Sequence, residues 1–220
     1  MSRDSWAKWT LSAALGLATG AAQASVTLLT DESFSTLSST NVAATIQADG
    51  TESGGIRLLS NGTPSPAPSN TIAPFRAITL GELGLTNAAD FRLIVAPQET
   101  DNTLSISTLG VTFFEPDGTQ LFIGTAATTF ALSTLTMAGQ GFVFGFDAAT
   151  AGAAQLAFAN PNNVIGVFGT FINSTGGPET LYVANRLDVS VPAVPEPATL
   201  ALLAAGLASG LGFARRRQRA

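Results

Sequence analysis

Residues 142–147 read Phe-Val-Phe-Gly-Phe-Asp, and this stretch decides the expected fold class. Phe142, Phe144 and Phe146 fall on one side of an extended chain, because successive side chains of a β-strand point to opposite faces. Residues 91–95, Phe-Arg-Leu-Ile-Val, repeat the alternation. A period of two with aromatic and β-branched residues is typical of strands that bury one face. The chain is therefore expected to be mainly β, with antiparallel strands.

Other segments share this strand-like composition. They are residues 26–29, 42–47, 56–59, 76–80, 104–107, 111–115, 120–123, 164–171 and 186–191. Residues 115–118, Glu-Pro-Asp-Gly, predict a tight turn between two of these strands, because Pro and Gly stand where such a turn needs them. Many short strands separated by turn signals predict an antiparallel β-sandwich, with a jelly roll as one arrangement.

Two segments interrupt the strand pattern. Residues 147–159 are rich in alanine, with Asp147 as an N-cap, and predict one short helix of about three turns. Residues 60–75 contain four prolines among small polar residues and predict an exposed, extended loop. We interpret this segment as an internal loop, not a divider between domains, because residues 25–59 are too few to form a core alone.

Residues 1–24 have the three-part layout of a secretory signal peptide. Arg3 and Lys8 precede a short apolar run, and Ala22 and Ala24 then form a small-x-small cleavage pattern. Cleavage there would leave Ser25 as the first residue of the exported protein. The pattern predicts handling by a Sec-type export machinery and a signal peptidase, and a short membrane anchor is the alternative.

Residues 193–220 have a different three-part layout. Val194, Pro195, Glu196 and Pro197 lead into residues 198–214, which carry no charge. These seventeen residues reach the lower limit of about 17–25 for a transmembrane helix. A basic end follows, formed by Arg215, Arg216, Arg217 and Arg219. Such a cluster stays on the cytoplasmic side, so we expect the helix to hold the exported chain in the inner membrane.

This tail resembles the PEP-CTERM sorting signal of Gram-negative bacteria. In that family an integral-membrane exosortase is thought to recognise Pro-Glu-Pro and to release or transfer the protein. Pro195, Glu196 and Pro197 match the motif, residues 198–214 match the helix, and the arginines match the basic end. The resemblance implies exosortase processing, transient membrane residence, and a final place at the cell surface or in the extracellular matrix. A permanent anchor is the alternative.

The body, residues 25–192, resembles an uncharacterised exported β-rich domain found in other PEP-CTERM proteins. The likeness rests on residues 91–95, the polar loop 97–102, residues 142–147 and residues 176–180. That domain carries no assigned activity, so the likeness implies none for this chain.

Missing residue types exclude several kinds of chemistry. The chain contains no Cys and no His, and its only lysine is Lys8. A Ser-His-Asp or Cys-His catalytic set, a zinc site of the usual ligands and haem ligation by these side chains are therefore excluded. Residues 25–192 contain four arginines and thirteen acidic residues, which gives a formal net charge of −9. Nucleic-acid binding is not expected, because it depends on basic side chains that neutralise phosphates.

The acidic loop 98–102 is the candidate metal site. Glu99, Asp101 and Asn102 place three oxygen-bearing side chains within four positions, and Ca²⁺ takes six to eight oxygen ligands. A solvated turn would use the same residue types. No other cofactor is expected.

The preferred function is that of an exported, non-enzymatic surface or extracellular-matrix protein with a structural or binding role associated with exopolysaccharide. One alternative is a carboxylate-dependent glycan hydrolase, which needs two carboxylates on either side of a cleft. The other is an adhesive module clamped by calcium.

Overall fold

A computed structural model describes residues 25–32, 38–66, 70–98, 104–126, 129–131 and 141–188. These residues belong to one compact unit of the chain. The expected signal peptide, the sorting tail and residues 99–102 of the acidic loop lie outside the described residues.

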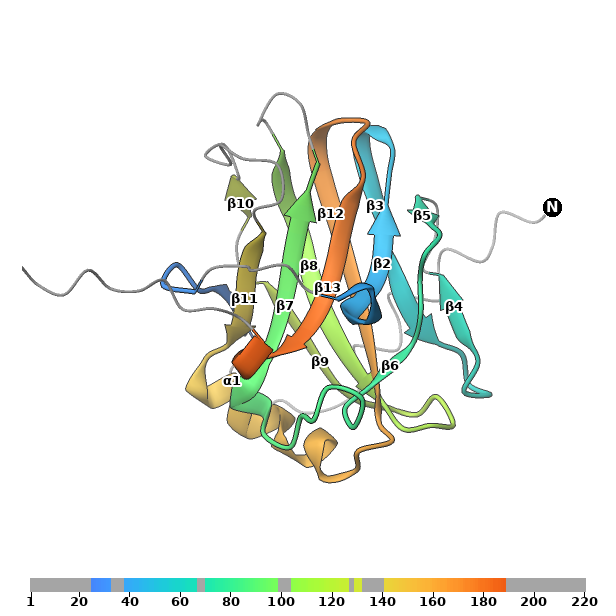
Figure 1. Cartoon of the computed structure of the whole chain (residues 1–220), viewed down its shortest axis with the longest axis vertical. Coiled ribbons are helices and arrows are strands. Elements are labelled where there is room, and N and C mark those ends of the chain that lie inside the picture. Colours follow the sequence, from blue (N-terminus) through green and yellow to red (C-terminus); the bar gives the residue numbers. More distant parts are fainter. Residues whose placement is uncertain are drawn as a thin grey trace, which may run out of the picture. The chain divides into compact units, whose positions relative to one another are not determined.

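The described chain is mainly β with one short α-helix, as expected (Figure 1). The strands are β1 (Ser25–Leu28), β2 (Val42–Ile46), β3 (Asp49–Leu58), β4 (Pro64–Pro66), β5 (Thr71–Ile72), β6 (Ile78–Thr79), β7 (Phe91–Pro97), β8 (Ser105–Phe114), β9 (Gln120–Ala126), β10 (Phe130–Ala131), β11 (Phe142–Phe146), β12 (Val164–Thr175) and β13 (Glu179–Asn185). The helical elements are α1 (Ala148–Ala154) and the 3₁₀ helices η2 (Ser39–Asn41), η3 (Ala88–Asp90), η4 (Gln155–Ala159) and η5 (Arg186–Asp188).

The strands form one continuous sheet where the sequence predicted a two-layer sandwich. Its order is β4-β3-β12-β8-β9-β1-β11-β7-β13-β2-β5, with β10 paired to β8 and β6 paired to β12. The described neighbours run antiparallel except β1 and β9, which are parallel. A twisted sheet with this many strands curls on itself, and the single apolar face then becomes the inside of a near-barrel.

The segment that contains β5 brings the two ends of this sheet together. The Asn70 N–H donates to the Ser53 carbonyl of β3 at 3.1 Å, and the Gly55 N–H donates to Thr71 Oγ1 at 2.9 Å. On its other side β5 pairs with β2. The expected Pro-rich loop 60–75 is thus an internal connection that contributes two short strands. The prolines of β4 suit an edge strand, because proline cannot donate to a further partner.

Aromatic side chains fill one end of the interior. Phe113 in β8 packs against Phe91, Phe146 and Phe158, with ring centroids 5.5, 6.2 and 4.8 Å away. Phe158 lies in η4, which follows α1 and covers this end of the sheet. Asp147 caps α1 as predicted, since its Oδ1 accepts from the Thr150 N–H at 2.7 Å. The α-helix ends at Ala154 and continues as a 3₁₀ helix, so it is shorter than expected.

Two more predictions, the tight turn before β9 and a strand after β13, can be compared with the structure. The turn over residues 115–118 is confirmed by the Gly118 N–H, which donates to the Glu115 carbonyl at 2.9 Å. The strand predicted over residues 186–191 is wrong for its described part, residues 186–188, which form η5. Asn185 Oδ1 accepts from the Leu187 N–H at 3.2 Å, and this local bond turns the chain out of the sheet.

Among the described residues, every helix is too short or too polar to cross a bilayer. The expected transmembrane segment 198–214 lies outside them.

Candidate functional site

Among the described residues, charged side chains are buried in two places, and the first is on the outer face of β7. Phe91, Leu93 and Val95 point into the main core, so Arg92 and Ile94 point outward. The chain after β1 covers this outer face: the Leu29 N–H donates to the Val143 carbonyl at 2.8 Å, and Leu29 packs on a small cluster that contains Ile94. Arg92 is thereby only 5% exposed.

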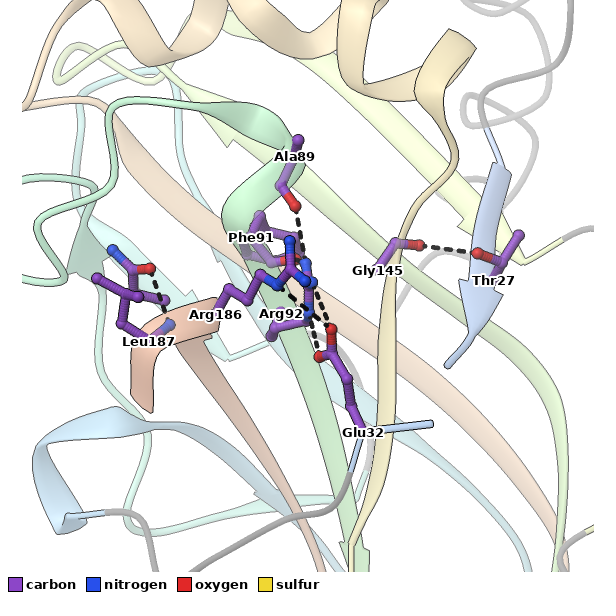
Figure 2. A network of polar contacts seen from close by, with 9 residues as sticks. Thr27, Glu32, Ala89, Phe91, Arg92, Gly145, Arg186 and Leu187 are labelled. Carbon is purple, nitrogen blue, oxygen red and sulfur yellow. Dashed lines mark hydrogen bonds and ion pairs between the residues drawn. The ribbon is translucent and has the colours of Figure 1, made fainter. Parts of the chain in front are cut away.

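Arg92 makes four hydrogen bonds within the protein (Figure 2). Its Nε donates to Glu32 Oε2 at 2.5 Å and its Nη2 donates to Glu32 Oε1 at 2.6 Å. Its Nη1 donates to the carbonyls of Ala89 and Phe91, both at 2.8 Å. The side chains of Arg92 and Glu32 are 6% and 7% exposed, and the Arg186 Nε lies 3.8 Å from Glu32 Oε1. Because both side chains are buried and bonded to each other, this pair holds residues 29–32 on the sheet, a structural role.

The second place is the interior, at the end formed by the β2–β3 and β12–β13 hairpins. Glu179 lies on the same face of β13 as Leu181 and Val183, which belong to the main core. Glu52 likewise lies on the same face of β3 as Gly54 and the core residue Ile56. Both glutamates are 0% exposed. Glu52 Oε2 accepts from the Ala48 N–H at 2.7 Å. Two acidic side chains therefore point into the interior of the near-barrel.

The tips of these two hairpins are joined by hydrogen bonds. Ser174 Oγ donates to the Ala48 carbonyl at 2.8 Å, and Gln47 Nε2 donates to the Gly176 carbonyl at 2.7 Å. Ser174 is buried. The bonds hold a polar layer over the end of the barrel that contains the two interior carboxylates.

The predicted calcium ligands, Glu99, Asp101 and Asn102, lie outside the described residues. Pro97, two residues before them, lies directly opposite Glu179 in the β7–β13 pair. Within the described ranges no group of three or more His, Cys, Asp or Glu residues could hold a metal ion. A metal site there would need ligands besides clustered acidic side chains.

Three exposed carboxylates have lowered pKa values, and each stabilises a turn or a cap. The Thr79 N–H, with Arg76 as a smaller influence, lowers the pKa of Glu82. The Thr119 N–H lowers the pKa of Asp117. The Thr150 N–H lowers the pKa of Asp147. A general acid needs a raised pKa, so these groups are suited to structure.

The processing residues predicted from the sequence lie at or beyond the limits of the described residues. Ala22 and Ala24, residues 194–197 and the arginines 215–217 and 219 lie outside them. Ser25 is the first residue of β1, which lies between β9 and β11, and its N–H donates to Thr150 Oγ1 at 2.8 Å. The residue expected to follow the cleavage site is therefore built into the sheet.

Comparison with protein families matches residues 193–218 to the PEP-CTERM protein-sorting motif. The tail carries this sorting motif. The match covers the Pro-Glu-Pro, the uncharged stretch and most of the basic end, so the resemblance noted from the sequence is confirmed for the tail. No curated protein and no solved structure matches the chain. The likeness of the body to an exported PEP-CTERM domain stays a prediction.

Sequence reasoning missed both buried charge sites. Neither Glu32 nor Arg92 carries a signal that would pair them, since they are 60 residues apart and meet only in the folded sheet. Glu179 does carry a signal. It is two and four residues before Leu181 and Val183, so the strand alternation alone places its carboxylate on the same, buried face.

Proposed function

We propose that this chain is exported, processed by an exosortase, and retained at the cell surface or in the extracellular matrix as a non-enzymatic structural or binding protein associated with exopolysaccharide. The observation that carries the proposal is the PEP-CTERM motif at residues 193–218. In this proposal residues 1–24 act as a signal peptide for Sec-type export and signal peptidase. Residues 198–214 cross the inner membrane until the exosortase acts.

The non-enzymatic role is supported by the structural contacts that four of the described carboxylates make. Glu82, Asp117 and Asp147 stabilise turns and a cap, and Glu32 neutralises Arg92. A glycan hydrolase requires two carboxylates that a sugar chain can reach from either side. Glu52 and Glu179 are fully buried, so this interior pair offers no support for the hydrolase alternative.

The intact mass of the protein tests the proposal in its own host. We expect the envelope and extracellular fractions to contain a species that starts at Ser25 and lacks the residues after the Pro-Glu-Pro. Any additional mass would then reveal attached sugar or lipid. A species that still contains residues 198–220 would mean a permanent membrane anchor, and the exosortase step would be wrong.

A matched pair of variants separates sorting from folding. Glu196→Ala changes the motif, and Glu115→Ala changes an exposed glutamate of the β8–β9 turn. We expect Glu196→Ala to accumulate in the inner membrane at its unprocessed mass. Glu115→Ala should be processed normally. Equal processing of both variants would show that Pro-Glu-Pro is not what the exosortase recognises.

A further inference from the structure

The interior carboxylate Glu179 has no partner. It is 0% exposed, and neither of its carboxyl oxygens has a hydrogen-bond partner. It lies directly opposite Ile46 in β2 and Pro97 in β7, and both of these side chains are buried and offer no donor. An ionised carboxylate in such surroundings costs several kcal/mol unless a positive charge compensates it.

Glu52 lies in the same layer of the interior. A Cβ atom placed on Gly54 would come within 3.0 Å of Ile46 Cγ1, so Ile46 reaches across to β3. Glu52 is two residues from Gly54 on the same face, and its carboxylate accepts from the Ala48 N–H, two residues after Ile46. Glu179 is next to Ile46 on its other side, in β13. Glu52 and Glu179 therefore lie on either side of Ile46, at the end where hydrogen bonds join the two hairpin tips.

The chain brings no described cation to this layer. Arg76 pairs with Glu82, and Arg92 and Arg186 approach Glu32. Arg57 also lies in β3, but it is five residues from Glu52, an odd number, so its side chain points to the opposite, outer face. The only lysine is Lys8, and the chain has no histidine. The compensating charge therefore has to come from outside the described protein, as a proton or as a metal ion.

We propose that Glu179 and Glu52 bind a calcium ion inside this end of the barrel. Two carboxylates offer up to four oxygens and two negative charges, which balance a divalent cation. Oxygen is the only ligand type the layer contains, and Ca²⁺ accepts oxygen ligands in flexible geometry, with water and backbone carbonyls completing the set. The ion would lie where the β2–β3 and β12–β13 hairpins join, and would fasten both to the barrel. Extracellular calcium modules bind with a Kd of about 10⁻⁴–10⁻³ M, which suits an exported protein.

Thermal unfolding of the mature protein, purified from host envelopes, tests this with CaCl₂ and EDTA as the probes. Saturating Ca²⁺ should raise the Tm of the EDTA-treated protein by about 5 to 10 °C, the shift expected at about 100 times the Kd for a domain of this size. Glu179→Gln and Glu52→Gln keep the side-chain shape, and the new amide oxygen of Glu52→Gln can still accept from the Ala48 N–H. We expect Glu179→Gln to lose the calcium response and Glu52→Gln to weaken it at least tenfold in Ca²⁺ concentration. Glu82→Gln, which alters an exposed carboxylate, should respond like the wild type.

Two results would overturn the proposal. One is a wild-type Tm that does not change with Ca²⁺ or EDTA. If the free energy of unfolding of that protein also falls as the pH rises, a proton neutralises Glu179 instead. The other is a calcium response that persists in Glu179→Gln, which would place the ion elsewhere. Where a variant fails to fold, native mass spectrometry of the wild type decides: one calcium per chain that EDTA removes supports the site, and none overturns it.

Discussion

Arg92 in β7 holds Glu32, sixty residues earlier in the chain, through two hydrogen bonds of 2.5 and 2.6 Å on the outer face of the sheet. Breaking a buried pair by removing one partner costs about 3–5 kcal/mol, because the remaining charge stays buried without compensation. We therefore expect Glu32→Ala to lower the free energy of unfolding by about this amount. Urea unfolding of the purified protein measures the loss.

The exposed pair Arg76–Glu82 is the matched control. Its N–O distance is 2.7 Å, but its side chains are 38% and 48% exposed, so solvent screens the attraction. Glu82→Ala should cost about 1 kcal/mol or less. Equal losses in Glu32→Ala and Glu82→Ala would show that burial of the Arg92 pair contributes nothing.

The cap of α1 should make stability depend on pH. The Thr150 N–H lowers the pKa of Asp147 below the ordinary 3.8, so the ionised form favours the folded state. This contribution is present above pH 3.8 and is lost as the pH falls through the lowered pKa. Asp147→Ala should cost about 1 kcal/mol at pH 6 and less at pH 3, measured by urea unfolding at both values.

Asn87 provides the uncharged comparison for that prediction. Its side chain caps η3 by accepting from the Ala89 N–H at 3.0 Å. Because the amide does not titrate in this range, the cost of Asn87→Ala should be the same at pH 6 and pH 3. A pH-dependent cost for Asn87→Ala would point to a cause other than the Asp147 carboxylate.

Two glycines should respond to alanine in opposite directions. Gly55 has φ +146°, and a Cβ there would lie 2.0 Å from the Val167 carbonyl oxygen, so β3 and β12 would have to separate. Gly152 lies in α1, exposed and with nothing within 4 Å of such a Cβ. We expect Gly152→Ala to raise the free energy of unfolding by about 0.5–1 kcal/mol and Gly55→Ala to lower it by more than this. Comparing both in one urea series checks the signs, and stabilisation by Gly55→Ala would contradict the close approach of the strands.

The aromatic end of the core should depend strongly on Phe113. This side chain is 0% exposed and contacts the rings of Phe91, Phe122, Phe146 and Phe158. Phe113→Ala should cost about 3–5 kcal/mol because it leaves a cavity among rings that cannot all move in. Phe75, which is 38% exposed, is the control, and Phe75→Ala should cost much less in the same measurement. Similar losses for both would mean that the ring cluster adds no stability.

The strands were predictable because their signal is local. In β7, β11 and β13 the alternation of core-facing and outward-facing residues can be read directly from the chain. Asp147 and the alanine-rich residues after it likewise predict the helix. The closure of the sheet into a near-barrel, in contrast, has no local signal. Closure depends on Asn70 reaching Ser53 and on β1 entering between β9 and β11, and both are contacts between segments that no short window contains.

The sequence by itself determined the β class, the N-cap of α1 and the sorting motif of the tail, because each depends on residues that are close together in the chain. Only the tertiary structure decided that the sheet curls into one near-barrel, that Glu32 meets Arg92, and that the inward-facing Glu179 has no hydrogen-bond partner. The physical reason is that pairing and burial depend on which distant strands become neighbours. A carboxylate at an inward position becomes a candidate ligand only when the strands around it supply no donor.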